Sequence, residues 1–79
     1  MTRGESVNKS TLKELRQRKR MTQEELANLT GISIRTIARY EKDVAVLRRA
    51  KYEKLKLIAE TLSVRVDDIF LGDVSVFVK

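Results

Sequence analysis

The sequence contains no cysteine, no histidine and no proline. Without cysteine there is no disulfide and no thiolate-bound metal, and without histidine the commonest general base and metal ligand are missing. No apolar run approaches the roughly 20 residues that span a bilayer, and the first ten residues lack the apolar stretch of a signal peptide. We therefore expect a soluble cytoplasmic protein that binds no metal and no cofactor.

An enzyme is also not expected from this composition. Catalysis would have to rest on carboxylates such as Asp67 and Asp68. Their place in the first turn of a helix expected near residue 66 explains them better, because acidic side chains are favourable at the positive end of a helix dipole.

The charge of the chain is positive and unevenly distributed. Seventeen Lys and Arg against eleven Asp and Glu give a net charge of +6. Residues 1–20 carry seven basic and two acidic side chains, whereas residues 61–79 carry two basic and three acidic ones. Such a basic segment indicates either an anionic partner, most often a nucleic acid, or a merely solvated basic surface.

A chain of 79 residues makes one small domain, and its pattern is helical from residue 11 onwards. Thr11 with Glu14 and Thr22 with Glu25 have the spacing of capping boxes, which predicts two short helices that follow one another. Residues 43–51 fit a loop, a turn or an early start to the next helix. The i, i+3, i+4, i+7 spacing of apolar residues predicts a helix at Tyr52, Leu55, Ile58, Ala59 and Leu62. A short last helix is expected over residues 66–71.

The two ends of the chain differ from this helical part. Residues 1–10 are polar and aperiodic, which predicts a flexible basic arm before a domain at residues 11–71. Within residues 72–79 the stretch VSVFVK alternates and is β-branched, which predicts a short C-terminal β-strand. An unpaired strand needs a partner. Pairing with a second subunit would make it a dimerisation segment, pairing with residues 44–47 would keep it within the chain, and it could also begin a further domain of a longer protein.

Gly31 lies between two segments that both read as helix. Ser33, two residues later, is a good N-cap for a third helix that ends near Glu41 or Lys42. A turn of about three or four residues that contains glycine sets two helices at a steep crossing, which is the geometry of a helix-turn-helix. Such a turn needs a positive φ, which a residue with a Cβ resists.

The third helix has two different faces. At about 100° per residue, Ile37 and Tyr40 point to one side, and the opposite side carries Arg35, Ala38, Arg39 and Lys42. Arginines reach guanine edges, and a small alanine lets a helix approach the floor of the major groove. An ordinary amphipathic helix with solvated arginines is the alternative. The capped helices around Gly31 and the basic helix before them favour DNA.

The segment LKELRQRKRMTQEELANLTGISIRTIARYEK, followed by LKLIAETLSVRVDDIF, resembles the Cro/phage-repressor type of helix-turn-helix, also called the xenobiotic-response-element type. The resemblance covers about residues 11–71 and depends on TQEELA, GIS and IARYE together. It implies an all-α, five-helix repressor-like DNA-binding domain, here with a short C-terminal β-strand. The second and third helices would form the motif, and the third would lie in the major groove.

The resemblance also implies roles for particular residues. Those facing the base edges would be Ser33, Ile34, Arg35, Ala38 and Arg39. Contacts to the phosphate backbone would come from Gln23, Arg18, Arg20, Thr36 and Lys42. Arg16 would pair with Glu41, and together with Gly31 this pair would be structural. Ile34 is apolar, so its side chain can only read a thymine methyl group or pack aside.

Some residues depart from the family pattern. Thr30 stands where an apolar residue is usual, and Leu29 is a candidate to compensate for it. Ser63 and Arg65 replace a more usual glycine and N-cap serine, which predicts a weakly capped junction before the last helix. The stretch DVAVLRRAK is longer than the family's usual loop.

The function expected from these features is sequence-specific binding of double-stranded DNA by a transcriptional regulator, more a repressor than an activator. One such domain reads few base pairs, so we expect a homodimer on an operator with an inverted repeat. Control by a protein antagonist fits a chain of this size. The alternative is a protein-interaction module, such as an antitoxin or an antirepressor partner, with weak DNA binding.

Overall fold

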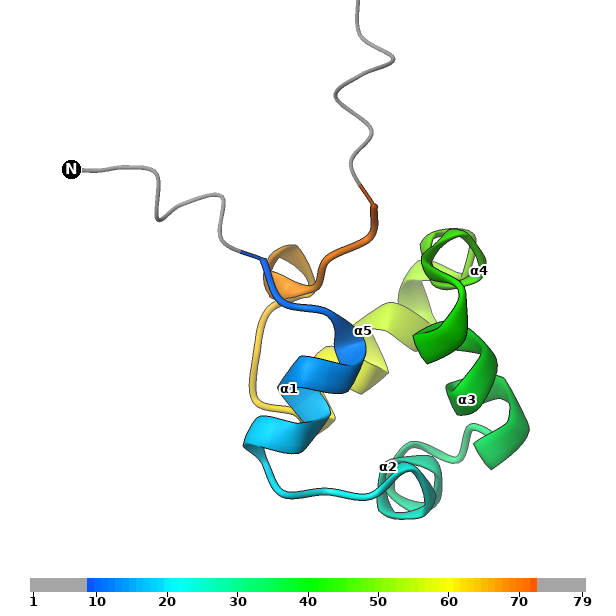
Figure 1. The fold of residues 1–79 in the computed structure, drawn as a ribbon, viewed down its shortest axis with the longest axis vertical. Coiled ribbons are helices and arrows are strands. Elements are labelled where there is room, and N and C mark those ends of the chain that lie inside the picture. Colours follow the sequence, from blue (N-terminus) through cyan, green and yellow to red (C-terminus); the bar gives the residue numbers. More distant parts are fainter. Residues whose placement is uncertain (1–8, 73–79) are drawn as a thin grey trace, which may run out of the picture.

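The computed structural model of the protein describes residues 9–72 (Figure 1). Within this range the chain forms α-helices and one three-residue 3-10 helix, as predicted for an all-α domain. The elements are α1 (Leu12–Arg18), α2 (Gln23–Thr30), α3 (Ile34–Lys42), α4 (Val44–Arg48), α5 (Tyr52–Thr61) and the 3-10 helix η2 (Val66–Asp68). Over the described residues there is no β-strand, only an isolated bridge between Ser10 and Ile69. The strand predicted at residues 74–79 lies outside them.

The first two helices begin at the predicted capping boxes. The Thr11 hydroxyl accepts a hydrogen bond from the Glu14 backbone N–H at 3.1 Å, and the Glu14 carboxylate accepts one from the Thr11 N–H at 2.8 Å. Thr22 and Glu25 make the same reciprocal pair at 3.0 and 2.8 Å. Each cap satisfies backbone donors that a helix start otherwise leaves unpaired, and its loss costs about 1 kcal/mol.

The segment after α3, which the sequence left open, forms α4. The carboxylate of Asp43 caps it by accepting a hydrogen bond from the Ala45 N–H at 3.0 Å. Leu47 anchors the helix, since only 1% of its surface is exposed. All of α4 therefore lies in a stretch for which a loop was one of the sequence-based alternatives.

The prediction of a last helix over residues 66–71 is wrong in its length. The structure has only the 3-10 helix Val66–Asp68, after which Ile69 is extended with φ −88° and ψ 127°. Ser10 explains the stop, because its carbonyl accepts from the Phe70 N–H at 2.7 Å and its N–H donates to the Asp68 carbonyl at 3.1 Å. These bonds satisfy backbone groups that a continuing helix would have used.

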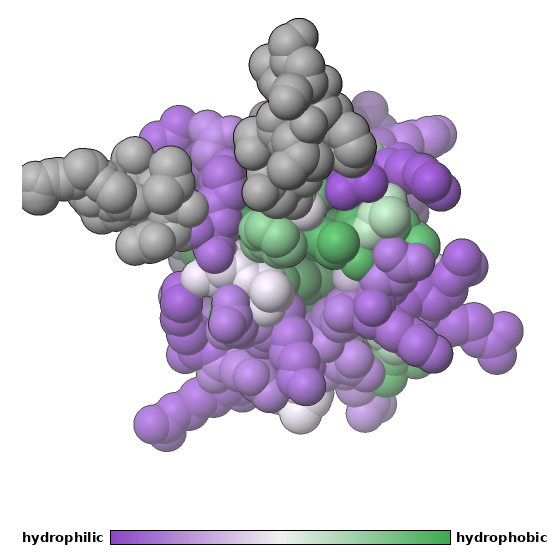
Figure 2. All heavy atoms as spheres, turned by 45° about the horizontal axis from the view of Figure 1, so that its top comes forward, coloured by the Kyte–Doolittle hydropathy of each residue, from purple (hydrophilic) through white to green (hydrophobic). Residues whose placement is uncertain are grey.

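The start and end of the described chain are thus joined. Besides the Ser10 backbone bonds, Lys9 Nζ donates to the Asp67 carbonyl at 2.6 Å, and Arg18 donates to the Ser10 hydroxyl at 2.7 Å. Figure 1 shows both ends above α1, away from α2 at the bottom of the view. In Figure 2 a hydrophobic area lies close to the end of the described chain, amid hydrophilic side chains.

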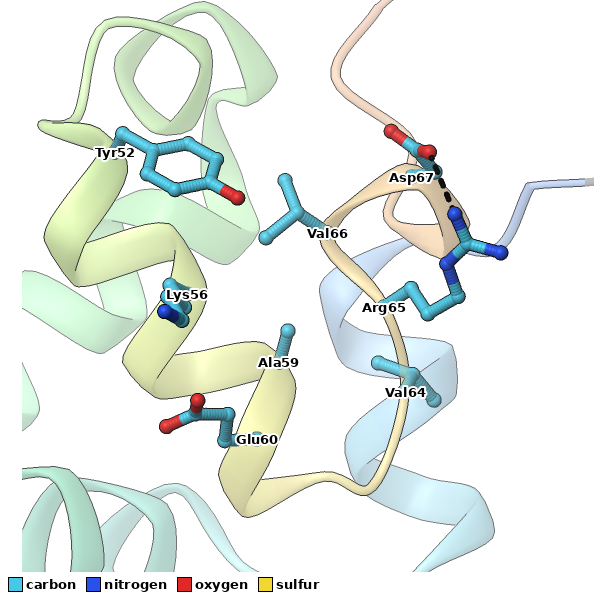
Figure 3. Close-up of a pocket in the computed structure, with 8 residues that line it drawn as sticks. All are labelled: Tyr52, Lys56, Ala59, Glu60, Val64, Arg65, Val66 and Asp67. Carbon is cyan, nitrogen blue, oxygen red and sulfur yellow. Dashed lines mark hydrogen bonds and ion pairs between the residues drawn. The ribbon is translucent and has the colours of Figure 1, made fainter.

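One core lies between the helices. Its buried hydrophobic members are Leu12, Leu15, Leu26, Ala27, Ile32, Ile37, Tyr40, Leu47, Leu55, Ile58, Ala59, Leu62 and Ile69. Tyr52, whose spacing helped to predict α5, does not belong to this core, since 64% of its surface is exposed. As the first residue of α5 it lies beyond the end of the core, and Figure 3 shows its ring over a surface hollow, opposite Val66.

No helix within residues 9–72 has the length and apolar character needed to cross a membrane.

Candidate nucleic-acid interface

The turn between α2 and α3 is built on backbone conformation. Gly31 has φ +76° and ψ 7°, and its N–H donates to the Ala27 carbonyl at 2.8 Å, which closes the end of α2. A Cβ built on Gly31 would have no neighbour within 4 Å. The glycine is therefore needed for its left-handed backbone and not for space. Ser33, two residues later, caps α3 by accepting from the Thr36 N–H at 3.1 Å.

Thr30 completes this turn in a way the sequence reading missed. Its side chain is buried, and its hydroxyl donates to the Leu26 carbonyl at 2.8 Å and accepts from the Ile32 N–H at 3.2 Å. Local hydrogen bonds of this kind make a buried threonine tolerable in place of an apolar residue. The idea that Leu29 compensates is wrong, because 62% of its surface is exposed.

The two faces of α3 differ in burial. Ile37 and Tyr40 lie in the core, whereas Arg35, Arg39 and Lys42 are exposed. Ala38 is half-buried between them. The remaining predicted base-facing residues, Ser33 and Ile34, are exposed at the start of the helix. The predicted base-facing residues therefore all lie on the exposed side or at the open N-terminal end of α3.

A buried ion pair holds the end of α3 to α1. Arg16 Nε lies 2.6 Å from Glu41 Oε2, Arg16 Nη2 donates to Glu41 Oε1 at 2.9 Å, and Arg16 Nη1 donates to the Met21 carbonyl at 2.7 Å. The side chains of Arg16 and Glu41 are 10% and 5% exposed. The hydrogen bond to Glu41 raises the pKa of Arg16, against the opposing effect of burial. The pair occupies both side chains within the fold, which fits a structural role.

Gln23 joins this network. Its amide donates to Glu41 Oε1 at 3.1 Å, so the first residue of α2 is tied to the end of α3. The amide nitrogen carries two donor hydrogens, and Glu41 takes one of them. The bond links residues 18 apart in sequence, and no local pattern could have revealed it.

The predicted phosphate contacts do not all lie together. Arg18 comes two residues after Arg16, about 200° around α1, and therefore points away from the side that meets Glu41. Its guanidinium binds the Ser10 hydroxyl instead. Arg20 is exposed in the turn before α2, with φ +54°, and Lys42 is exposed at the end of α3. Thr36 is half-buried, and its hydroxyl accepts from Ser33 Oγ at 2.9 Å.

The exposed side of α3 is cationic without an opposing charge of its own. Glu41 is the one acidic residue of this helix, and Arg16 neutralises it. Arg35, Arg39 and Lys42 therefore present three positive charges, with no free carboxylate on the same helix to cancel them. Such a face attracts a polyanion, and this attraction weakens as salt increases.

The match to a known family agrees with this geometry. The family model of the helix-turn-helix named HTH_3, of the Cro/phage-repressor type, matches residues 12–69. The chain belongs to this family. The resemblance seen in the sequence is therefore confirmed, and with it the assignment to a family of DNA-binding domains and not of enzymes. Comparisons with curated proteins and with solved structures gave no match.

In this helix-turn-helix domain, sequence reasoning overlooked two exposed polar residues of α2. Glu24 and Asn28 lie beside Ser33 and Ile34, where all four line a shallow hollow between α2 and the start of α3. Their spacing of four residues places them on one face of α2. That spacing was visible in the sequence, but only the position of the following helix shows which face it is.

Proposed function

We propose that the protein is a sequence-specific transcriptional repressor that inserts α3 into the major groove of double-stranded DNA. The proposal rests on the exposed cationic side of α3. The Gly31 turn fixes one end of this helix, and the Arg16–Glu41 pair fixes the other end. A rigid helix with arginines around a small residue suits base-edge recognition. The resemblance to phage repressors supports repression as the outcome.

Each predicted contact has a part in this proposal. Arg35 and Arg39 would reach guanine edges, Ala38 would allow the close approach, and Ser33 and Ile34 would face the bases at the start of the helix. Gln23, Arg20, Thr36 and Lys42 would contact phosphates, which fix the register without reading sequence. Arg18 is left out, because its guanidinium is bonded to Ser10 on another side of α1.

The proposal includes a homodimer on an inverted repeat. Half-sites of helix-turn-helix dimers lie about 34–36 Å apart along the DNA. The described domain measures 38, 26 and 20 Å along its principal axes, so two of its three axes are shorter than this spacing. Two copies side by side on one face of the duplex are therefore compatible in size with successive major grooves.

Selection of binding sites from a random duplex pool tests the proposal. We expect a short inverted repeat to be enriched, and Arg39→Ala to weaken its binding by about 1–3 kcal/mol, the value of a bidentate arginine–guanine contact. Arg65→Ala is the matched control, since Arg65 directly precedes η2 and its side chain is 81% exposed. Its binding should stay near that of the wild type.

Other outcomes of this selection count against the proposal. If the pool yields only salt-sensitive binding without a preferred sequence, the basic surface is real but the repressor function is wrong. Equal losses for Arg39→Ala and Arg65→Ala would show a general charge effect and would remove Arg39 from the base contacts.

A further inference from the structure

Ile34 is an exposed hydrophobic residue at the start of a helix whose other isoleucine is buried. As the first residue of α3 it has 48% of its surface exposed, whereas Ile37, three residues on, has none. The sequence left two roles for Ile34, contact with a methyl group or packing aside. Its exposure excludes the second, because a packed isoleucine would be buried with the core.

The polar side chains near Ile34 are hydrogen-bonded to each other. The Ser33 hydroxyl accepts from the Thr36 N–H at 3.1 Å and donates to the Thr36 hydroxyl at 2.9 Å, so both hydroxyls bond to each other at the helix start. One turn further on, at i+4, is Ala38. Ile34 and Ala38 therefore form an apolar strip along α3, next to the parallel strip of Arg35 and Arg39.

The surface beside Ile34 is open and concave. A shallow hollow is lined by Glu24, Ala27 and Asn28 of α2 and by the turn residues 31–34. Ile34 lies at the α3 edge of this hollow. A small group that projects from the floor of a groove could therefore reach the side chain without displacing any part of the core.

The major groove offers one such group. Thymine presents a methyl on C5, whereas cytosine has only a hydrogen at that position and the other groups that bases expose there are hydrogen-bond donors and acceptors. An isoleucine side chain has no donor or acceptor, so contact with a methyl is the only favourable recognition it can make. 5-Methylcytosine carries the same methyl at the same ring position.

We propose that Ile34 is a specificity-determining residue that recognises the 5-methyl group of one pyrimidine in each half-site. This inference rests on the proposed function, because it requires α3 to lie in the major groove. It goes beyond that function by naming the chemical group that this residue reads. Its source is thymine in unmodified DNA and 5-methylcytosine where the site is methylated.

The test uses the full 79-residue chain and the duplex enriched by selection. Each thymine in turn is replaced by deoxyuridine, which removes the methyl and keeps the base pair. Burial of one such carbon corresponds to about a fourfold change in affinity. We expect the wild type to lose about fourfold at one thymine of each half-site and to be unaffected at the rest.

Variants of Ile34 show whether this residue carries the effect. Ile34→Ala should bind the thymine and deoxyuridine duplexes equally, whereas Ile34→Val should keep most of the difference. Both should fold, since the side chain is half-exposed, and a melting curve checks this. In a second arm, cytosine and 5-methylcytosine are compared at the same position, and the wild type should bind the methylated duplex about fourfold more tightly.

Three results would overturn the inference. The first is a wild type that binds its selected sequence with the same affinity after every deoxyuridine replacement. This result would overturn the inference about Ile34 but not the proposed function. A deoxyuridine penalty that persists in Ile34→Ala would assign the methyl contact to another residue. If no sequence is enriched at all, the proposed function is wrong and this inference falls with it.

Discussion

Four of the described residues have the left-handed backbone that glycine favours, and two of them, Arg20 and Ser63, are not glycine. Gly31 ends α2 with φ +76°, and Ser63 follows α5 with φ +59°. A side chain in this conformation costs roughly 1–2 kcal/mol per residue. The junction after α5 therefore contains a strained residue in Ser63, but the Arg65 N–H is capped, since it donates to the Asp68 carboxylate at 2.9 Å.

Replacing Gly31 should act through the backbone. Gly31→Ala meets no neighbouring atom, so we expect a loss of about 1–2 kcal/mol in unfolding free energy and an unchanged fold. Gly31→Asn should lose less, because asparagine tolerates the left-handed region better. Urea unfolding of both variants measures this. Equal stability of Gly31→Ala and wild type would contradict a conformational requirement at this turn.

The opposite change is expected to help at Ser63. Ser63→Gly relieves the backbone strain and should raise the unfolding free energy by about 0.5–1 kcal/mol, after allowance for the greater freedom of glycine in the unfolded chain. Ser63→Ala is the control, since it keeps the Cβ and should give no gain. Thermal melting compares the three proteins. A gain in both variants would point to the hydroxyl and not to φ.

At the scale of elements, the helices differ in how well they begin. Side chains cap α1, α2, α3 and α4, whereas the start of α5 has no side-chain cap. Its N-cap residue is Lys51, which has the extended backbone of an N-cap with φ −61° and ψ 144°. The stability of α5 therefore comes from packing, through Leu55, Ile58 and Ala59. The site itself lies on better-capped elements.

A cap should strengthen α5. Lys51→Ser supplies a hydroxyl where the backbone is already extended, and we expect about 1 kcal/mol of added stability. Lys54→Ser, inside the same helix, removes the same charge without capping and should lower stability by a few tenths of a kcal/mol. Chemical denaturation gives both values. If the two variants behave alike, loss of positive charge and not capping explains the result.

At the scale of the whole molecule, Ser10 joins the start of the described chain to its end through hydrogen bonds with the backbone of Asp68 and Phe70. This contact packs the end of the described chain onto the start of α1, outside the motif formed by α2 and α3. Arg48 adds a contact at the same end by donating to the Leu71 carbonyl at 3.0 Å. The helix-turn-helix is thus held in a domain whose two ends stabilise each other.

Truncation measures the contribution of this contact. A chain that begins at residue 11 loses both backbone bonds of Ser10 and the side-chain bonds from Lys9 to Asp67 and from Arg18 to Ser10. We expect it to be about 2–4 kcal/mol less stable than a chain that begins at residue 9, at about 0.5–1 kcal/mol for each bond. DNA affinity should be similar for the two when both are folded. A difference near zero would mean that the bridge adds nothing to the stability of the domain.

The sequence predicted the parts of this fold that depend on local signals. The capping boxes at Thr11 and Thr22 and the glycine at Gly31 were readable because each is decided by residues at most three apart. The end of η2 was not readable, since it depends on Ser10, nearly sixty residues away. Periodicity predicted the helix at Tyr52 but not the exposure of its side chain, because spacing gives a direction around a helix and not the distance to the core.

The candidate site divides in the same way. The exposed side of α3 follows from about 100° per residue, and so from the sequence alone. The bond from Gln23 to Glu41 and that from Arg18 to Ser10 join different elements, so only the structure separates the residues near the motif from those that point elsewhere. The contacts to bases and phosphates stay predictions.

The central claim is that α3 reads base edges in the major groove, and methylation protection on the selected duplex tests it most directly. Dimethyl sulfate modifies guanine N7 in the major groove and adenine N3 in the minor groove. The bound wild type should protect guanine N7 within each half-site, and Arg39→Ala should lose protection at one of these guanines. Protection confined to adenine N3, or no protection of a sequence that is bound, would contradict the claim.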